Sequence, residues 1–78
     1  MTNYQNAPEP HRIVAPLAGI WRRTVPQDSS VAEGDVVGYV EAIKLDAAVT
    51  APAAGTIHYV IDEDFVDVDG VDDLAELR

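Results

Sequence analysis

The 78-residue chain contains no cysteine, which excludes disulfides, thiol catalysis and thiolate metal sites. It also has few aromatic residues, with one Trp, one Phe and three Tyr. The apolar residues are mostly Val and Ala, a composition that favours a thin core built from β-strands. No apolar run approaches the length of a membrane span. Residues Met1–Pro10 are polar and lack an apolar stretch, so we do not expect a secretory signal.

Basic residues are scarce as well. The chain has 5 Lys and Arg residues against 14 Asp and Glu, which gives a net charge of −9 and a sequence pI of about 4.2. This charge repels a phosphate backbone and an anionic lipid surface. We therefore expect neither nucleic acid nor a membrane as a partner, and a cytoplasmic location is the default expectation.

The sequence offers only weak metal-binding patterns. His11 and His58 are far apart and no carboxylate stands at ligand spacing from them, so we do not expect a zinc site. The stretch Asp67–Gly70 partly fits a calcium loop. The first ligand of that loop would be Phe65, which cannot coordinate a cation. We interpret the acidic stretch as a solvated face and expect no metal.

The composition changes near residue 12. Residues 1–11 are polar and include Pro8 and Pro10, so we expect a disordered N-terminal tail over 1–11. The remainder, 12–78, has the size of one small domain, and a domain this small buries only about 60% of its unfolded surface.

The chain repeats itself within this domain. Ala15–Gly19 reads Ala-Pro-Leu-Ala-Gly, and Ala51–Gly55 reads Ala-Pro-Ala-Ala-Gly at an offset of 36 residues. Gly34 and Gly70 share this offset, and after them the register slips by one residue. A repeat of only two copies predicts two similar halves related by a pseudo-twofold axis, not a solenoid.

Both halves have the pattern of short strands separated by Gly and Pro, which is typical of a small sandwich or flattened barrel. We expect strands at Ile13–Ala15, Gly19–Val25, Val36–Ala42, Ala47–Ala51, Thr56–Ile61 and Asp73–Arg78.

The single lysine, Lys44, falls between the two halves. Val36–Ala42 and Ala47–Ala51 are expected to be the arms of a hairpin, with Ile43–Asp46 at its tip. No Asn-Gly or Asp-Gly marks this turn. A tight hairpin without glycine often forces an ordinary residue to positive φ. If the protein carries a group on a side-chain amine, Lys44 is the only candidate; alternatively, it is what an acidic, lysine-poor composition left behind.

The residues around this lysine carry a family likeness. Glu41–Leu45 reads Glu-Ala-Ile-Lys-Leu and is followed by Ala51-Pro52-x-x-Gly55. This resembles the biotinyl domain of biotin carboxyl carrier proteins, which typically reads Glu-Ala-Met-Lys-Met with a proline eight residues after the lysine. The resemblance covers about residues 12–78. It implies an all-β flattened β-barrel (barrel-sandwich hybrid) of two four-stranded sheets with pseudo-twofold symmetry, and a modified lysine on a hairpin tip.

By this resemblance, Lys44 is the attachment site of covalent biotin, and Glu41, Ala42, Ile43 and Leu45 form the hairpin that a biotin protein ligase reads. The domain itself is not a catalyst. It holds biotin and shuttles a carboxyl group between biotin carboxylase and carboxyltransferase sites, as in an acyl-CoA carboxylase such as acetyl-CoA carboxylase in fatty acid biosynthesis.

The match departs from the family pattern in two places. Ile43 and Leu45 replace the two methionines that flank the lysine, and the second repeat crowds aspartates where the family usually has a simpler Gly-rich turn, at Asp67, Asp69, Asp72 and Asp73. Lipoyl domains of 2-oxo acid dehydrogenase-type complexes share the fold and the lysine-to-proline spacing. Their lysine is typically preceded by aspartate, and Ala42 with the apolar neighbours of Lys44 favours biotin. A third hypothesis is an unmodified relative that serves as a structural or interaction module.

Overall fold

The computed structural model describes residues 12–61 and 63–78, so the expected tail over 1–11 lies outside the described residues. All regular elements in this part of the chain are strands. Their bounds are β1 (Arg12–Val14), β2 (Gly19–Arg23), β3 (Ser30–Val31), β4 (Val36–Glu41), β5 (Asp46–Thr50), β6 (Gly55–Tyr59), β7 (Val66–Val68) and β8 (Asp73–Leu77).

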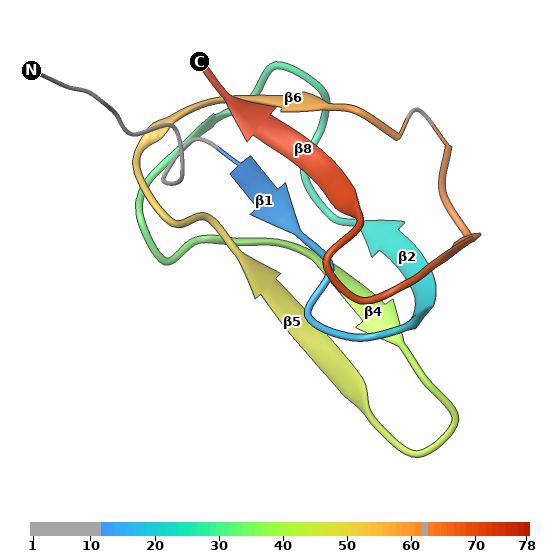
Figure 1. The fold of residues 1–78 in the computed structure, drawn as a ribbon. Helices are drawn as coiled ribbons and strands as arrows, with labels where there is room; N and C mark the ends of the chain where they lie inside the picture. The colour runs from blue at the N-terminus through green and yellow to red at the C-terminus, as the bar shows by residue number, and fades with distance from the viewer. Residues whose placement is uncertain (1–11, 62) are drawn as a thin grey trace, which may run out of the picture.

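The strands form two antiparallel sheets of four strands each, in the orders β1-β8-β6-β3 and β5-β4-β2-β7 (Figure 1). The sheets stay separate and pack face to face as a flattened barrel-sandwich, so the expected fold class is confirmed. The six expected strands are all present, and no end differs from its expected position by more than two residues. Over the described residues, no helix has the length and hydropathy to span a bilayer.

The pseudo-twofold relation is visible in the sheet orders. If each strand is exchanged for its counterpart in the other half, β1 for β5, β2 for β6, and so on, the order β1-β8-β6-β3 becomes β5-β4-β2-β7. Each sheet therefore takes two strands from each half of the sequence. Neither half could bury its apolar face alone, because its strands are distributed over both sheets.

The register slip between the two halves lies in a different place from the one expected. The Gly34 N–H donates to the Ala51 oxygen at 2.8 Å, and the Val71 N–H donates to the Ala15 oxygen at 2.8 Å. Val71 is therefore the counterpart of Gly34, and the pairing of Gly34 with Gly70 was wrong. Hydrogen bonds fix this turn, so it cannot absorb an extra residue.

The extra residue is accommodated earlier, in the loop that follows β6. Asp28 and Phe65 both have positive φ, 66° and 60°. The Asp28 N–H bonds the Ile57 oxygen, and the Phe65 N–H bonds the Trp21 oxygen, which identifies the two residues as counterparts. The insertion therefore falls before Phe65, in a surface loop where it leaves the strand ladders unchanged.

This correspondence leaves Val71 in a conformation that suits glycine. Val71 has φ of 63° and is 76% exposed, and Gly34 occupies the equivalent place with φ of 90°. A β-branched residue in the left-handed region is strained. We expect Val71→Asn to raise the free energy of unfolding by about 1 kcal/mol, because asparagine tolerates this region and little apolar burial is lost.

Urea denaturation checks this prediction as a higher midpoint at an unchanged slope. Val60→Asn is the matched control, since Val60 is 53% exposed and has no positive φ. An equal gain in both variants would show that surface polarity, not backbone strain, is responsible.

The core lies between the two sheets. Its largest fully buried side chains are Trp21, Ile57, Leu74, Val37 and Val40. Trp21 and Ile57 point inward between outward-facing neighbours, as alternation along a strand requires. In β4 and β8 the alternation is interrupted, so that Val37 is followed by buried Gly38 and Leu74 by buried Ala75. Tyr59 packs against Trp21 with ring centroids 6.2 Å apart. Its hydroxyl donates to the Val25 oxygen at 2.7 Å, and burial raises the pKa of Tyr59.

Candidate site of covalent attachment

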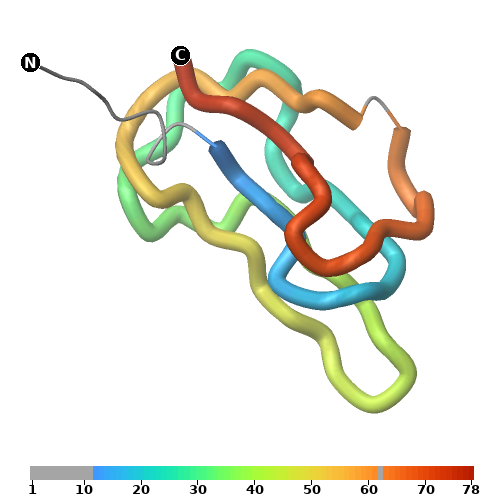
Figure 2. The backbone as a smooth tube through the Cα atoms, in the orientation of Figure 1, coloured from blue at the N-terminus to red at the C-terminus, as the bar shows by residue number. Residues whose placement is uncertain are grey.

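The site is built on the hairpin of β4 and β5, which projects beyond the body of the domain (Figure 2). The strands pair in register with Glu41 opposite Asp46 and Val40 opposite Ala47. The Ala42 N–H donates to the Leu45 oxygen at 2.9 Å and closes the tip. The expected hairpin is therefore confirmed. Its first arm ends at Glu41 instead of Ala42, and its second arm begins at Asp46 instead of Ala47.

The turn is formed without left-handed backbone. Among the described residues, the non-glycine residues with positive φ are Asp28, Phe65 and Val71, and none belongs to this hairpin. The expectation of positive φ at the tip was therefore wrong. The chain reverses through Ile43 and Lys44 without the strained geometry of a primed turn, so glycine is not required there.

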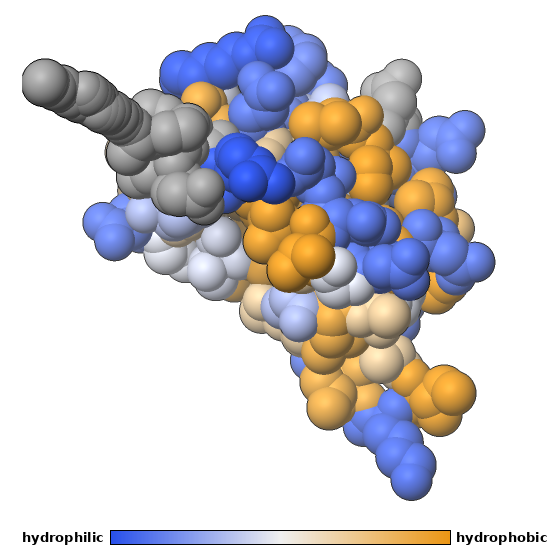
Figure 3. Space-filling model, viewed as in Figure 1, coloured by the Kyte–Doolittle hydropathy of each residue, from blue (hydrophilic) through white to orange (hydrophobic). Residues whose placement is uncertain are grey.

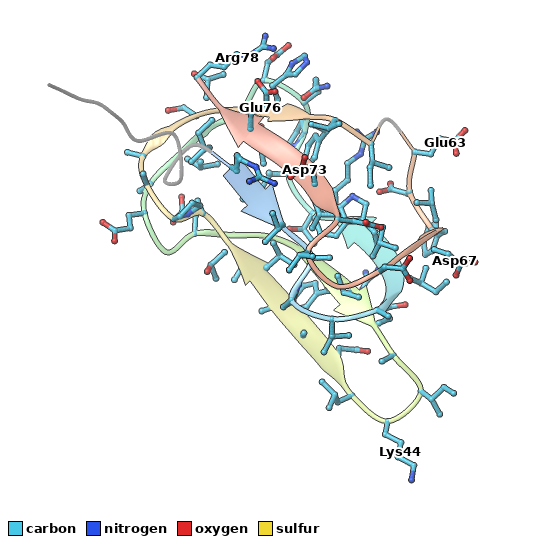
Figure 4. The ribbon with its side chains drawn as sticks, viewed as in Figure 1. Lys44, Glu63, Asp67, Asp73, Glu76 and Arg78 are labelled. Atoms are coloured by element: carbon cyan, nitrogen blue, oxygen red, sulfur yellow. The ribbon has the colours of Figure 1, made fainter. Side chains whose placement is uncertain are left out.

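Lys44 is exposed at the outermost point of the hairpin, and its side chain points away from the body (Figure 4). Ile43 is 100% exposed and Leu45 is 57% exposed. Ile43 therefore makes no contribution to the packing of its own domain, and Leu45 makes only a partial one. The residue types at these two positions can therefore be set by contacts with the proteins that bind the lysine.

The base of the hairpin is held by contacts with β2. A Cβ on Gly19 would lie 2.6 Å from the Glu41 oxygen, so the two strands approach too closely for any side chain there. Arg22 Nε donates to Glu41 Oε2 at 2.9 Å. The Arg22 guanidinium also lies over the ring of Tyr39, with its Cζ 5.7 Å from the ring centroid. Glu41 is half-buried and is engaged inside the domain, which assigns it a role in positioning the hairpin. Its recognition by a ligase stays a prediction.

A groove lies between the hairpin tip and the segment that enters β2. It is lined by backbone and side chains of residues 17–20 and 41–45. Leu17, Ala18 and Ile20 border it on the body side, and Lys44 itself borders it on the hairpin side. Figure 3 shows apolar side chains gathered around this tip and the adjoining part of the body.

Sequence reasoning missed the part of this groove that comes from residues 17–20. The signal was present, because Ala15–Gly19 was recognised as one copy of the repeat, but a repeat does not say which copy meets the hairpin. Only the pairing of Ile20 with Glu41 across β2 and β4 brings the segment beside the lysine. The described residues form no cluster of His, Cys, Asp or Glu with the arrangement of a metal site.

The profile of the Biotin_lipoyl family, described as biotin-requiring enzyme, matches residues 6–77, and the chain belongs to this family. Domains of this family are carriers that hold biotin or lipoate covalently on a lysine, and they are not themselves catalytic.

Solved structures contain similar domains. A single-chain, multi-domain long-chain acyl-CoA carboxylase matches with 26% identity and a TM-score of 0.72, over 83% of this chain and 7% of that one. An aspartoacylase family protein from Mesorhizobium loti matches with 19% identity and a TM-score of 0.77, over 94% and 24%. The product-bound ectoine utilization protein EutE from Ruegeria pomeroyi matches with 17% identity and a TM-score of 0.72, over 99% and 24%.

The chain thus spans a quarter or less of the length of each of these three proteins. At their level of identity, the likeness to the aspartoacylase family protein and to EutE shows the fold alone. The family match and the exposed lysine carry the functional argument.

Proposed function

We propose that the domain carries covalent biotin on Lys44 and serves as the mobile carboxyl carrier of a biotin-dependent carboxylase. The observation that carries this proposal is the position of the only lysine in the chain, exposed at the tip of a projecting hairpin in a domain of the Biotin_lipoyl family. Ala42 and the apolar neighbours Ile43 and Leu45 favour biotin over lipoate, as does the likeness to an acyl-CoA carboxylase.

The geometry suits an amine that must enter the active sites of other proteins. When bound, biotin supplies the atom that carries the carboxyl group; the protein supplies placement. The Lys44 Nζ lies at the end of a flexible stem, and the stem stands on a hairpin whose base is fixed by Arg22 and Glu41. Tethering replaces two bimolecular encounters by local ones at high effective concentration.

Three partners follow from this role. A biotin protein ligase would form the amide on Lys44 and read the tip around it, with Ala42, Ile43 and Leu45 in contact. A biotin carboxylase and a carboxyltransferase would then receive the same tip in turn. Because Ile43 is fully exposed, its replacement of a family methionine alters these partner contacts and leaves the domain's own packing unchanged. We propose a cytoplasmic setting, where such ligases and carboxylases work.

Intact mass spectrometry tests the proposal. The protein is incubated with ATP and either a biotin protein ligase with biotin or a lipoate ligase with lipoate. We expect the mass of one biotin to be added, with a tryptic or acidic-protease fragment locating it at Lys44. Addition of one lipoyl group only would establish the lipoyl carrier instead. No addition in either reaction would identify an unmodified relative and contradict the proposal.

A further inference from the structure

The groove beside Lys44 is too apolar for a surface that faces only water. Leu17 packs partly against the core, and Ile20 stands on the outer face of β2, because its neighbour Trp21 points inward. Across the groove, Leu45 and Ile43 leave most of their surface exposed. Together, these four side chains and the small residues between them make the groove apolar, and it begins at Lys44.

Among the described residues, the groove has only two charged side chains in its lining. Apart from Lys44, the only charged side chain that lines it is Glu41. Its carboxylate accepts from Arg22 Nε at 2.9 Å and lies 2.8 Å from Arg22 Nη2. Attachment of an acyl group would convert the Lys44 ammonium into a neutral amide. The groove would then contain no unpaired charge, and the apolar acyl chain of the attached group would meet little desolvation cost in it, with the polar ureido group of biotin turned towards water.

We propose that this groove is the resting place of the arm attached to Lys44. The proposal rests on the proposed function, because it requires an acyl group on this lysine. The chemistry recognised is shared by biotin and lipoate, since each has a five-carbon acyl chain that ends in a sulfur-containing five-membered ring. The chain packs along Leu17 and Ile20, and the ring lies over Ala18, which is exposed and carries only a methyl group.

A tethered occupant is favoured over a side chain of a partner by concentration alone. A group linked by a short flexible stem reaches a neighbouring groove at an effective concentration on the order of millimolar. A weak apolar contact is then enough to hold the arm for much of the time. The arm leaves when a partner active site offers a better environment, so the groove holds the arm between visits without blocking transfer.

The test uses the full chain, biotinylated by a ligase and verified by intact mass, with ¹³C-labelled Ile and Leu methyl groups. We expect nuclear Overhauser contacts from the biotin chain and ring to the methyl groups of Leu17 and Ile20. Contacts to Ile43 and Leu45 do not count, because these residues adjoin Lys44 in sequence.

A second readout is the rate at which streptavidin captures the arm. Ala18→Glu introduces a charge into the groove, and Ala18→Gln introduces bulk and polarity without charge, which separates the groove from long-range steering. We expect both to raise the capture rate about threefold, which corresponds to an arm docked for about two-thirds of the time. The matched control is Ala54→Glu, because Ala54 is the exposed pseudo-symmetric counterpart of Ala18 and belongs to the turn between β5 and β6. It should leave the rate unchanged.

The failures of the two proposals are distinguishable. If Lys44 is fully biotinylated but shows no contacts to Leu17 and Ile20, and the Ala18 variants behave as wild type, the groove proposal is overturned while the carrier function stands. If the Ala18 variants instead slow the ligase and no contacts are seen, the groove belongs to ligase recognition and the proposal is again overturned. If only lipoate is attached, nuclear Overhauser contacts from its acyl chain to Leu17 and Ile20 are measured instead. Their presence supports the groove proposal, and their absence overturns it.

Discussion

Lys44→Arg should abolish covalent attachment and leave the fold intact. Arginine keeps the positive charge but offers no amine that forms a stable amide, and the chain has no second lysine. The exposed tip makes few packing contacts, so the free energy of unfolding should change by less than about 0.5 kcal/mol. Streptavidin binding after ligase treatment measures the first effect, and thermal unfolding measures the second.

A matched control restores the amine at the wrong place. In Lys44→Arg with Arg78→Lys, the number of lysines and the net charge equal those of wild type, but the lysine stands at the end of the molecule remote from the hairpin (Figure 4). This double variant should remain unlabelled. Labelling of either variant would place the attachment elsewhere, with the N-terminal amine as the first position to examine, and would contradict the role assigned to the hairpin.

Gly38→Ala should be the most destabilising single substitution of a small residue in the described part of the fold. A Cβ on Gly38 would lie 2.4 Å from Cη2 of Trp21 and 2.6 Å from the backbone oxygen of Arg22. Trp21 is fully buried and cannot move aside without disturbing the core. We expect a loss of about 3 kcal/mol, the upper end of the range for overpacking, and a fall in Tm of about 15 °C.

A double-mutant cycle identifies the cause. Trp21→Phe alone should destabilise the domain, because it leaves part of the indole volume empty. Combined with Gly38→Ala, it should cost clearly less than the sum of the two single changes, since the added methyl group then occupies space that the indole has vacated. Strict additivity would mean that the contact with the Arg22 backbone oxygen, not the indole, limits this position.

The sequence predicted those features that depend on residue identity or on a short local pattern. A lone lysine in a Glu-Ala-x-Lys-x context names the attachment candidate whatever the surrounding fold. Repeated Ala-Pro-x-Ala-Gly segments indicate two like halves, and apolar residues between Gly and Pro predict six of the eight strands. These signals are local, so they survive in the sequence without any knowledge of what packs against what.

β3 and β7 escaped prediction for the converse reason, whereas β1, which is as short as β7, was predicted from the apolar run that ends before Pro16. β3 has two residues and β7 has three, too few to show any alternation. They exist because β6 and β2 offer them an unpaired edge. The place of the register slip was misjudged on similar grounds. Gly70 resembles Gly34 by residue type, but hydrogen bonds to Ala15 and Ala51 assign the equivalent position to Val71.

The sequence by itself therefore determined the fold class, the internal repeat and the identity of the lysine. Only the tertiary structure decided what surrounds that lysine. The pairing of β2 with β4 brings Ile20 opposite Glu41, sets Arg22 against the hairpin base, and places the segment that begins at Leu17 beside the tip. These contacts join residues 19 or more positions apart. Which distant segments meet is fixed by the burial of both sheets against each other, a property that no short stretch of sequence contains.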